Sequence, residues 1–349
     1  MPEFTLRPME PTDGPAIDAI IREEAQTTSI SMTTSYRHDV YKSLMAQHPS
    51  LFGVVAETPG VGGLAGFATA FLDQATIAGR PYPTAHLENL KVRSDLRRQG
   101  LGARLAAWRI EEAERRFGGD GVLTAAIDSS NVASIATARH WASQIVGPIS
   151  LRIARPSAKP PPERGPIVRP LRGDDAEEVV AGISTFYRNH DLVPVTTASS
   201  LSASLASTSL GEPIREYRVA VASDGSIVAG AGVGERFKLV TDHIDRIPLP
   251  LAVLGTIAGM IPPGRTIRSV ELFLAWHAPG RADAARQIWN AIRFEWRDRV
   301  TSVIGLADPR STLIDAFPVG RMPGPRVELV VPVRSPVPID AKRLVYLWR

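Results

Sequence analysis

Residues 86–102 carry the side chains of this chain that are best suited to chemistry. His86 and Glu88 stand two positions apart, and in an extended strand alternate side chains share one face. A histidine and a carboxylate are groups that can take a proton from a substrate near neutral pH. The segment therefore offers a candidate general base, with Glu88 ranked slightly ahead of His86. A carboxylate paired with an arginine and a hydrogen-bonded core histidine are the alternatives.

An arginine- and glycine-rich loop follows these two residues. A predicted strand ends at Val92, and the next predicted helix begins at residue 101. The segment from Val92 to the first turn of this helix contains Arg97, Arg98, Gly100 and Gly102. The first amides of a helix have no intrahelical partner, and the helix dipole is positive there. Glycines let the backbone approach a ligand closely, and arginines donate charge-assisted hydrogen bonds to phosphate. The loop therefore predicts an anion site, although its spacing fits neither the dinucleotide fingerprint nor the P-loop. Glycines that serve only packing are the alternative.

The elements that would position these groups follow a mixed pattern. A helix is predicted over 101–117, with two apolar stripes and an end at Gly118. The other predicted elements of the first 155 residues are strands 4–7, 51–57, 62–72, 84–92, 121–127 and 145–154 and helices 13–25, 37–47 and 131–142. This order predicts an α/β fold of the α+β type, with a mixed, mostly antiparallel central sheet flanked by helices.

The chain also repeats itself. Arg7 and Asp13 recur 162 positions later as Arg169 and Asp175, each time between a predicted strand and a predicted helix. The proline run between the copies is typical of a stiff linker. We expect an N-terminal domain over residues 1–155, a linker over 156–166 and a C-terminal domain over 167–349. Coincidence between two α/β segments is the alternative.

Composition narrows the function classes. The 349 residues carry a net charge of +4, and the basic residues are scattered, so no nucleic-acid partner is expected. No cysteine is present, which excludes disulfides and an acyl-cysteine intermediate. The seven histidines have no metal-ligand spacing, so no metal is expected. No signal peptide is visible and no apolar stretch is long enough to cross a bilayer, so we expect a cytoplasmic protein with no membrane partner.

The loop resembles a known signature. Arg97, Gly100 and Gly102 match the pattern (Arg/Gln)-x-x-Gly-x-(Gly/Ala), which binds the acyl-CoA pyrophosphate in the GNAT superfamily of N-acetyltransferases. That family also carries an asparagine after its fifth strand, and Asn131 stands at that place here. The two copies look like those of tandem two-domain GNAT proteins.

This resemblance implies a cofactor site and a reaction. The co-substrate would be acetyl-CoA or another acyl-CoA, and a small-molecule primary amine would attack it directly in a ternary complex. Bases of the family occur six and four positions before the residue at Val92, which are His86 and Glu88 here. The implied acyl-CoA contacts are Leu90, Lys91, Val92, Arg97, Arg98, Gln99, Gly100, Leu101, Gly102, Asn131 and Ser134.

One departure from the family concerns the general acid. The tyrosine that many members carry seven residues after the asparagine is Ala138 here. Ser134, Thr137, His140 or a water molecule is left to protonate the thiolate. The gap favours a second hypothesis, a catalytically weak acyl-CoA-binding or sensing protein whose C-terminal domain is an interaction module.

The second copy is expected to be degenerate. An ungapped alignment places Glu271 at the Glu88 position and Ala275 at Val92. It also places Gly280, Asp283 and Ala285 at the three signature positions and Ser311 at the asparagine. A carboxylate repels a diphosphate and a Cβ blocks close approach. We expect this copy to shape the acceptor pocket or to replace a second subunit. Pro194–Ser209 and Leu249–Ile261 are candidates to line that pocket, and ordinary packing is the alternative for both segments. The chain would be a monomer or homodimer.

Overall fold

A computed structural model of the chain describes residues 3–23, 26–27, 31–59, 62–247, 261–319 and 327–347. The first half contains β1 (Thr5–Pro8), α1 (Gly14–Glu23), β2 (Gln26–Thr27), β3 (Ser31–Tyr36), α2 (Val40–Gln47), β4 (Leu51–Glu57), β5 (Gly66–Ile77), β6 (Arg80–Val92), α3 (Leu101–Phe117), β7 (Val122–Thr124), β8 (Ile127–Asp128), α4 (Val132–Ala138) and β9 (Gln144–Ala154). The second contains β10 (Ile167–Pro170), α5 (Ala176–Phe186), β11 (His190–Asp191), β12 (Val193–Pro194), α6 (Ala198–Ala206), β13 (Arg215–Val221), β14 (Ile227–Gly234), β15 (Val240–Arg246), β16 (Thr266–Ile267), β17 (Ser269–His277), α8 (Ala282–Glu295), β18 (Ser302–Ala307), α9 (Leu313–Ala316), β19 (Val327–Arg334) and β20 (Leu344–Val345).

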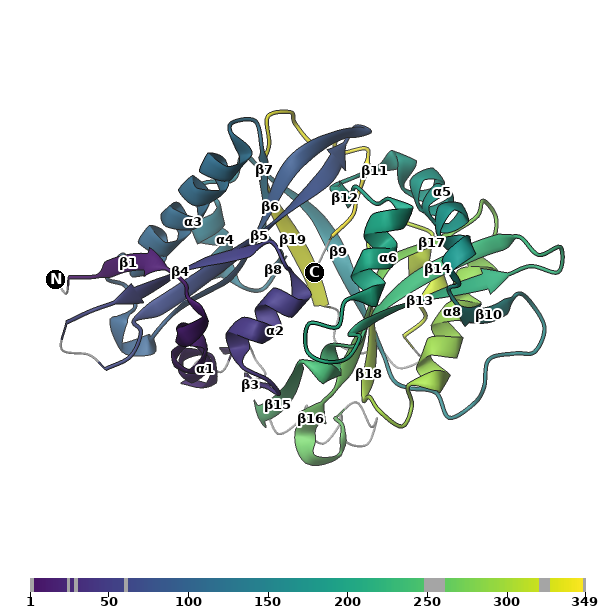
Figure 1. The fold of residues 1–349 in the computed structure, drawn as a ribbon, viewed down its shortest axis with the longest axis horizontal. Coiled ribbons are helices and arrows are strands. Elements are labelled where there is room, and N and C mark those ends of the chain that lie inside the picture. The colour runs from purple at the N-terminus through teal and green to yellow at the C-terminus, as the bar shows by residue number, and fades with distance from the viewer. Residues whose placement is uncertain are drawn as a thin grey trace.

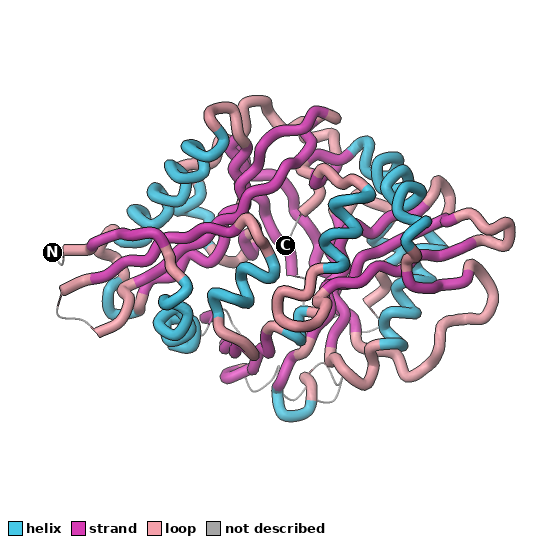
Figure 2. Tube along the Cα trace, viewed as in Figure 1, coloured by secondary structure: helices cyan, strands magenta, loops and turns pink. Residues whose placement is uncertain are grey.

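One large sheet runs through both halves. Its strand order is β1-β4-β5-β6-β7-β19-β9-β18-β17-β14-β13-β10, and most neighbouring strands are antiparallel. The two parallel pairs in this order are β6–β7 and β17–β18. The order reads the same from either end when each strand is matched with its counterpart in the other half. Helices flank the strands of both halves (Figure 2), so the predicted fold class is confirmed.

The two halves exchange their last strands. Strand β19 of the second half pairs with β7 of the first, and β9 of the first half pairs with β18 of the second. Figure 1 shows β19, in yellow, beside the blue strands of the first half. The segment 156–166 forms no helix or strand and lies along α8, where Gln287 donates to the carbonyl of Pro162.

Helix α3 begins and ends where the sequence predicts. It buries Leu101, Leu105 and Ile110 among other residues, and its C-cap Gly118 has φ 72°. That left-handed conformation is the one glycine adopts at helix ends without strain. The predicted strand 84–92 starts earlier, at Arg80, and the predicted helix 131–142 ends at Ala138.

The repeated arginine and aspartate form the same ion pair in both halves. The Arg7 guanidinium makes two hydrogen bonds of 2.8 and 2.7 Å to the Asp13 carboxylate, and Arg169 makes two of 2.6 and 2.9 Å to Asp175. Each carboxylate also accepts a backbone N–H three residues before it. In each half this carboxylate therefore ties the first strand to the turn before the first long helix.

Candidate active site

The first half opens its sheet at the predicted site. The register between β6 and β7 ends at the pair His86–Thr124, and no later pair of these strands is formed in the described chain. The residues of β6 after this point, Glu88 to Val92, are half-buried. Parallel strands that separate leave the edge of β6 available to an extended ligand. Residues 93–100 connect the end of β6, at this opening, to the start of α3.

A β-bulge marks this opening. The register between β5 and β6 shifts between Phe67 and Thr69, and Asn89 has φ 48°, a left-handed conformation that is uncommon outside glycine. The Asn89 amide donates to the Thr69 hydroxyl at 3.0 Å. A bulge changes which backbone groups face each edge, so it re-aims the N–H groups of the following residues.

Arg109 of α3 lies buried beneath the bulge. Its Nη1 donates to the carbonyl of Glu88 at 2.6 Å and to that of Thr69 at 3.2 Å. Burial lowers the pKa of Arg109 to about 10, and the Glu88 carboxylate acts in the opposite direction. The sequence analysis missed this residue, although its spacing of four from Leu105 and from Ala113 places it on the buried stripe of the helix.

Glu88 stands where the two halves of the chain meet. Burial raises the pKa of Tyr36 to about 12, and both Arg236 and Glu88 act on this hydroxyl electrostatically. Arg236 belongs to the second half and forms ion pairs with Asp242 and, at 3.5 Å, with Glu271. Strand β3, which carries Tyr36, pairs with β15 of the second half. The second half therefore contributes a charged group, Arg236, that acts on the same hydroxyl as Glu88.

His86 lies in the core of the first half. It is 7% exposed, and its Nδ1 is 2.7 Å from the Thr124 hydroxyl. Its ring stacks on Phe71 at 4.6 Å, and Phe71 stacks on His48 at 3.7 Å. Burial lowers the pKa of His86 to about 4. The imidazole is therefore neutral at neutral pH and a much weaker base than an ordinary histidine.

The arginine–glycine loop leads into the start of α3, and we call this place the glycine cradle. Gly100 is the N-cap of α3 with φ 80°, and a Cβ at that position would meet no atom within 4 Å. The nearest atom to a Cβ at Gly102 is the Val92 side chain at 3.9 Å. Arg98 has φ 61°, and the first turn of the helix carries no acidic residue. The helix start is thus open and electropositive, as an anion site requires.

The structure brings most of the other predicted contacts to the same place. Leu90, Lys91 and Val92 form the end of β6, Leu101 begins α3 as a buried residue, and Arg97 donates to the Val92 carbonyl at 3.3 Å. The Gln99 side-chain oxygen is buried with no partner in the described chain. Asn131 caps α4 and accepts the Ser134 N–H at 3.0 Å, so its side-chain oxygen serves the helix.

The second half repeats the opening but not in the expected register. The pairing of β17 with β18 ends at Glu271–Ile304, and the bulge residue is Leu274, with φ 44°. Matching the two bulges places Phe273 at the Glu88 position and Glu271 at His86. The ungapped alignment of Glu271 with Glu88 was therefore wrong by two residues.

The cleft of the second half is filled by its own side chains. Leu274 N–H donates to the Tyr346 hydroxyl at 3.1 Å, and the Leu274 carbonyl accepts from Tyr217 at 2.8 Å. Tyr187 donates to the carbonyl of Ala275 at 2.6 Å. Residues 274–277 are all buried, and the remaining cavity beside Tyr187 and Tyr346 is about 10 Å³.

The C-terminal segment delivers Tyr346 to this cleft. Strand β20 pairs in parallel with β11, and Val345 N–H donates to the Asp308 carboxylate at 3.1 Å. Arg343 donates to the buried Asp191 carboxylate at 2.8 Å. Helix α8 begins after a loop of only residues 278–281, against 93–100 in the first half, and carries Asp283 in its first turn. The second half therefore lacks the acid-free helix start of the first.

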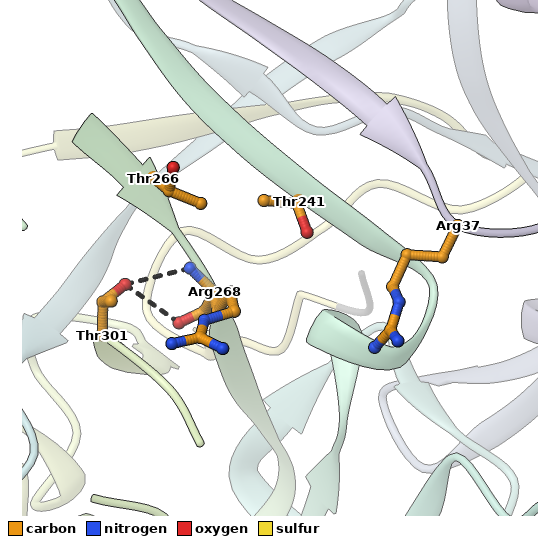
Figure 3. A pocket seen from close by; sticks show the side chains of 5 residues that line it. All are labelled: Arg37, Thr241, Thr266, Arg268 and Thr301. Carbon is orange, nitrogen blue, oxygen red and sulfur yellow. Dashed lines mark hydrogen bonds between the residues drawn. The ribbon is translucent and has the colours of Figure 1, made fainter. Parts of the chain in front are cut away.

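A separate cavity of about 440 Å³ lies at the junction of β15, β16 and the start of β18 (Figure 3). It is lined by Arg37, Thr241, Thr266, Arg268 and Thr301. None of these is a predicted site residue, and Pro194–Ser209 does not line it; Leu249–Ile261 lies almost wholly outside the described residues. Among the described residues no group of acidic or histidine side chains could hold a metal ion, and no helix could span a membrane.

A family model identifies the first half. Residues 17–141 match the Acetyltransferase (GNAT) family, and this range contains Glu88, the arginine–glycine loop and Asn131. The resemblance predicted from the loop is confirmed, because this part of the chain matches the GNAT acetyltransferase family. No curated protein matches the sequence at a significant level.

Solved structures share the fold of the whole chain. N-myristoyltransferase from Saccharomyces cerevisiae with bound myristoyl-CoA aligns with a TM-score of 0.66 and 12% identity, covering 99% of this chain and 89% of that one. A GCN5-related N-acetyltransferase from Sphaerobacter thermophilus aligns with a TM-score of 0.58 and 16% identity, covering 95% of both chains. A probable N-acyltransferase from Enterococcus faecalis V583 aligns with a TM-score of 0.52 and 12% identity, covering 98% of this chain and 74% of that one.

Proposed function

We propose that the chain is an acyl-CoA-dependent N-acyltransferase that works in its first half and transfers an acetyl group to a small-molecule primary amine. The observation that carries this proposal is the open helix start at Gly100 beside the separated strands β6 and β7. A diphosphate on the first amides of α3 would extend its pantetheine arm along Leu90–Val92. The family match supports acyl-CoA as the co-substrate.

The reaction needs a base and a group that polarises the thioester. The amine nitrogen forms a bond to the acyl carbon, the carbon–sulfur bond breaks, and CoA leaves as a thiolate that takes a proton from water. The amine proton passes to Glu88, directly or through water. Backbone N–H groups that follow the bulge at Asn89 stabilise the carbonyl oxygen as charge develops on it.

Glu88 is a better base than His86 in this geometry. Glu88 is half-buried at the opening, whereas His86 is 7% exposed, is bound to Thr124 and stacks on Phe71. His86 remains the alternative base, and its expected contribution is to support Glu88 from the core.

The acceptor would approach from the side where the halves meet. The charges of Glu88 and Arg236 both act on the Tyr36 hydroxyl, which supports this direction of approach. The second half would thus form one wall of the acceptor site, while its own cleft stays closed by Tyr346. Because the first half would bind acyl-CoA and the second half would supply this wall, the complete site needs no second chain.

The test is release of CoA from acetyl-CoA in the presence of a panel of primary amines, with the N-acyl product identified by mass spectrometry. We expect amine-dependent release well above the rate of thioester hydrolysis. Because the fold is shared with a protein that binds myristoyl-CoA, a parallel series uses myristoyl-CoA. Faster transfer from myristoyl-CoA would replace acetyl with a long acyl chain. Binding of either thioester without transfer would instead favour the acyl-CoA sensor.

A further inference from the structure

We propose that Arg109 is a positioning residue for acyl transfer: it holds the β6 bulge in its active geometry and keeps Glu88 ionised. This inference rests on the proposed function and adds a residue that neither the loop signature nor the family match indicates. Arg109 is 5% exposed, so it acts through Glu88 and the backbone and does not touch substrate.

The contacts place Arg109 at the two ends of the bulge. Thr69 and Glu88 are the last pair in register before the shift between β5 and β6. One nitrogen of Arg109, Nη1, donates hydrogen bonds to both of their carbonyl oxygens, at 3.2 and 2.6 Å. A donor shared by two carbonyls across a strand pair fixes their separation. The backbone that follows, from Asn89 onward, is therefore held in the direction that the thioester carbonyl needs.

The second half holds its bulge with neutral donors, on the carbonyls of the two residues that follow Phe273. There the carbonyls of Leu274 and Ala275 accept hydroxyls from Tyr217 and Tyr187. Those hydroxyls hold the second bulge without burying a charge. Burying a guanidinium costs free energy, which lowers the pKa of Arg109 to about 10.

The positive charge of Arg109 accompanies the carboxylate of Glu88 in the first half. The residue before the first bulge is Glu88, and its charge favours the protonated form of Arg109. The interaction is reciprocal, so the charge of Arg109 favours the ionised form of Glu88. The residue before the second bulge is Phe273, which has no charge to stabilise, and the donors there are neutral tyrosines. The two halves thus differ at both members of the pair.

The test compares Arg109→Met and Arg109→Lys with the wild-type protein. Arg109→Met removes both the positive charge and the guanidinium fork, by which we mean the N–H groups that donate to the two carbonyls. Arg109→Lys keeps the charge and removes the fork. We expect Arg109→Met to lower kcat about 100-fold, to change KM for acyl-CoA less than about 3-fold, and to move the acid limb of the kcat–pH profile upward by about one unit. Arg109→Lys should recover the acid limb and part of kcat. Arg115→Met, an exposed arginine of the same helix, is the matched control and should change neither.

Four outcomes overturn the inference. A folded Arg109→Met variant with wild-type kcat and pH profile shows that the charge has no catalytic effect. Equal loss in the Met and Lys variants, with an unmoved acid limb, shows a purely structural role. If Arg109→Met does not fold, Arg109→Lys decides: a wild-type kcat there shows that the fork does not position the bulge. A wild-type protein that transfers no acyl group would overturn the proposed function first, and this inference with it.

Discussion

The two halves of this chain build the same strand opening and then treat it in opposite ways. The first half separates β6 from β7, and the second half separates β17 from β18. Each half places a residue with a left-handed conformation in the bulge, Asn89 in the first and Leu274 in the second. In the first half the residues after the bulge stay half-buried beside an open helix start. In the second half they are buried under tyrosines, one of which comes from the end of the chain. The fold therefore supplies a cleft, and the side chains around it decide whether a ligand can enter.

The helix starts differ in the same direction. Gly100 caps α3 after a loop of residues 93–100, and no acidic residue follows in the first turn. Arg281 caps α8 after a shorter loop, and Asp283 follows it. A carboxylate at a helix start takes the place that an anionic ligand would otherwise have. The comparison predicts one acyl-CoA site per chain.

The largest expected effect is at the base. Glu88→Gln should lower kcat about 100-fold or more, because the variant cannot take the amine proton, while KM for acyl-CoA changes little. Steady-state CoA release measures both constants. The matched variant of the second half is Phe273→Leu, which should keep the wild-type kcat. A Glu88→Gln enzyme with wild-type kcat would transfer the base role to His86 or to water.

The next effect tests the two helix starts with one substitution. Gly100 and Gly280 have nearly the same φ, 80° and 75°, and a Cβ at either meets no atom within 4 Å. The backbone strain of an aspartate is therefore similar at both. Gly100→Asp should weaken acetyl-CoA binding about 100-fold by calorimetry, because its charge faces the diphosphate. Gly280→Asp should leave the affinity unchanged, and equal losses would contradict the assignment of the site to the first half.

The third effect is on stability and pH. The pKa of His86 is lowered to about 4 by burial, and Glu271 stands at its position in the second half. Because the unfolded chain binds the proton more readily, the contribution of His86 is complete above about pH 6.5 and falls as the pH drops toward 4. Urea unfolding should show about 2 kcal/mol less stability from this residue at pH 5 than at pH 7. His86→Gln should flatten the pH dependence by that amount; an unchanged slope would contradict the burial argument.

The smallest expected effect is at Tyr346, one of the side chains that fill the cleft of the second half. Tyr346→Phe removes the acceptor of the buried Leu274 N–H and should lower the free energy of unfolding by about 1 kcal/mol. Thermal and urea unfolding measure this loss. Transfer activity should not change, because the second cleft takes no part in the reaction. A fall in kcat with no loss of stability would show that the second cleft serves catalysis.

Local patterns predicted much of the first half. Helix 101–117 follows from its apolar stripes and its glycine end, and the arginine–glycine loop marks the helix start that the structure shows to be open. These features depend on residues that are close in the chain. The recurrence of Arg7 and Asp13 likewise predicted the correspondence between the halves.

Features that depend on distant residues were not predicted. Strand exchange pairs β19 with β7, and no local pattern specifies a partner so far along the chain. The second copy was aligned two residues out of register, because the position of its bulge at Leu274 is set by tyrosines from three other segments. Arg109 was not singled out from the sequence, because its two carbonyl partners belong to other elements, β5 and β6.

The most direct test of the difference between the two clefts is native mass spectrometry of the full chain with increasing acetyl-CoA. The open first cleft and the filled second cleft predict one bound acetyl-CoA per chain at saturation. Two bound molecules would show that Tyr346 yields its place to a ligand and that the second half is a working site. No bound molecule at millimolar acetyl-CoA would leave the glycine cradle without its ligand and contradict the proposed function.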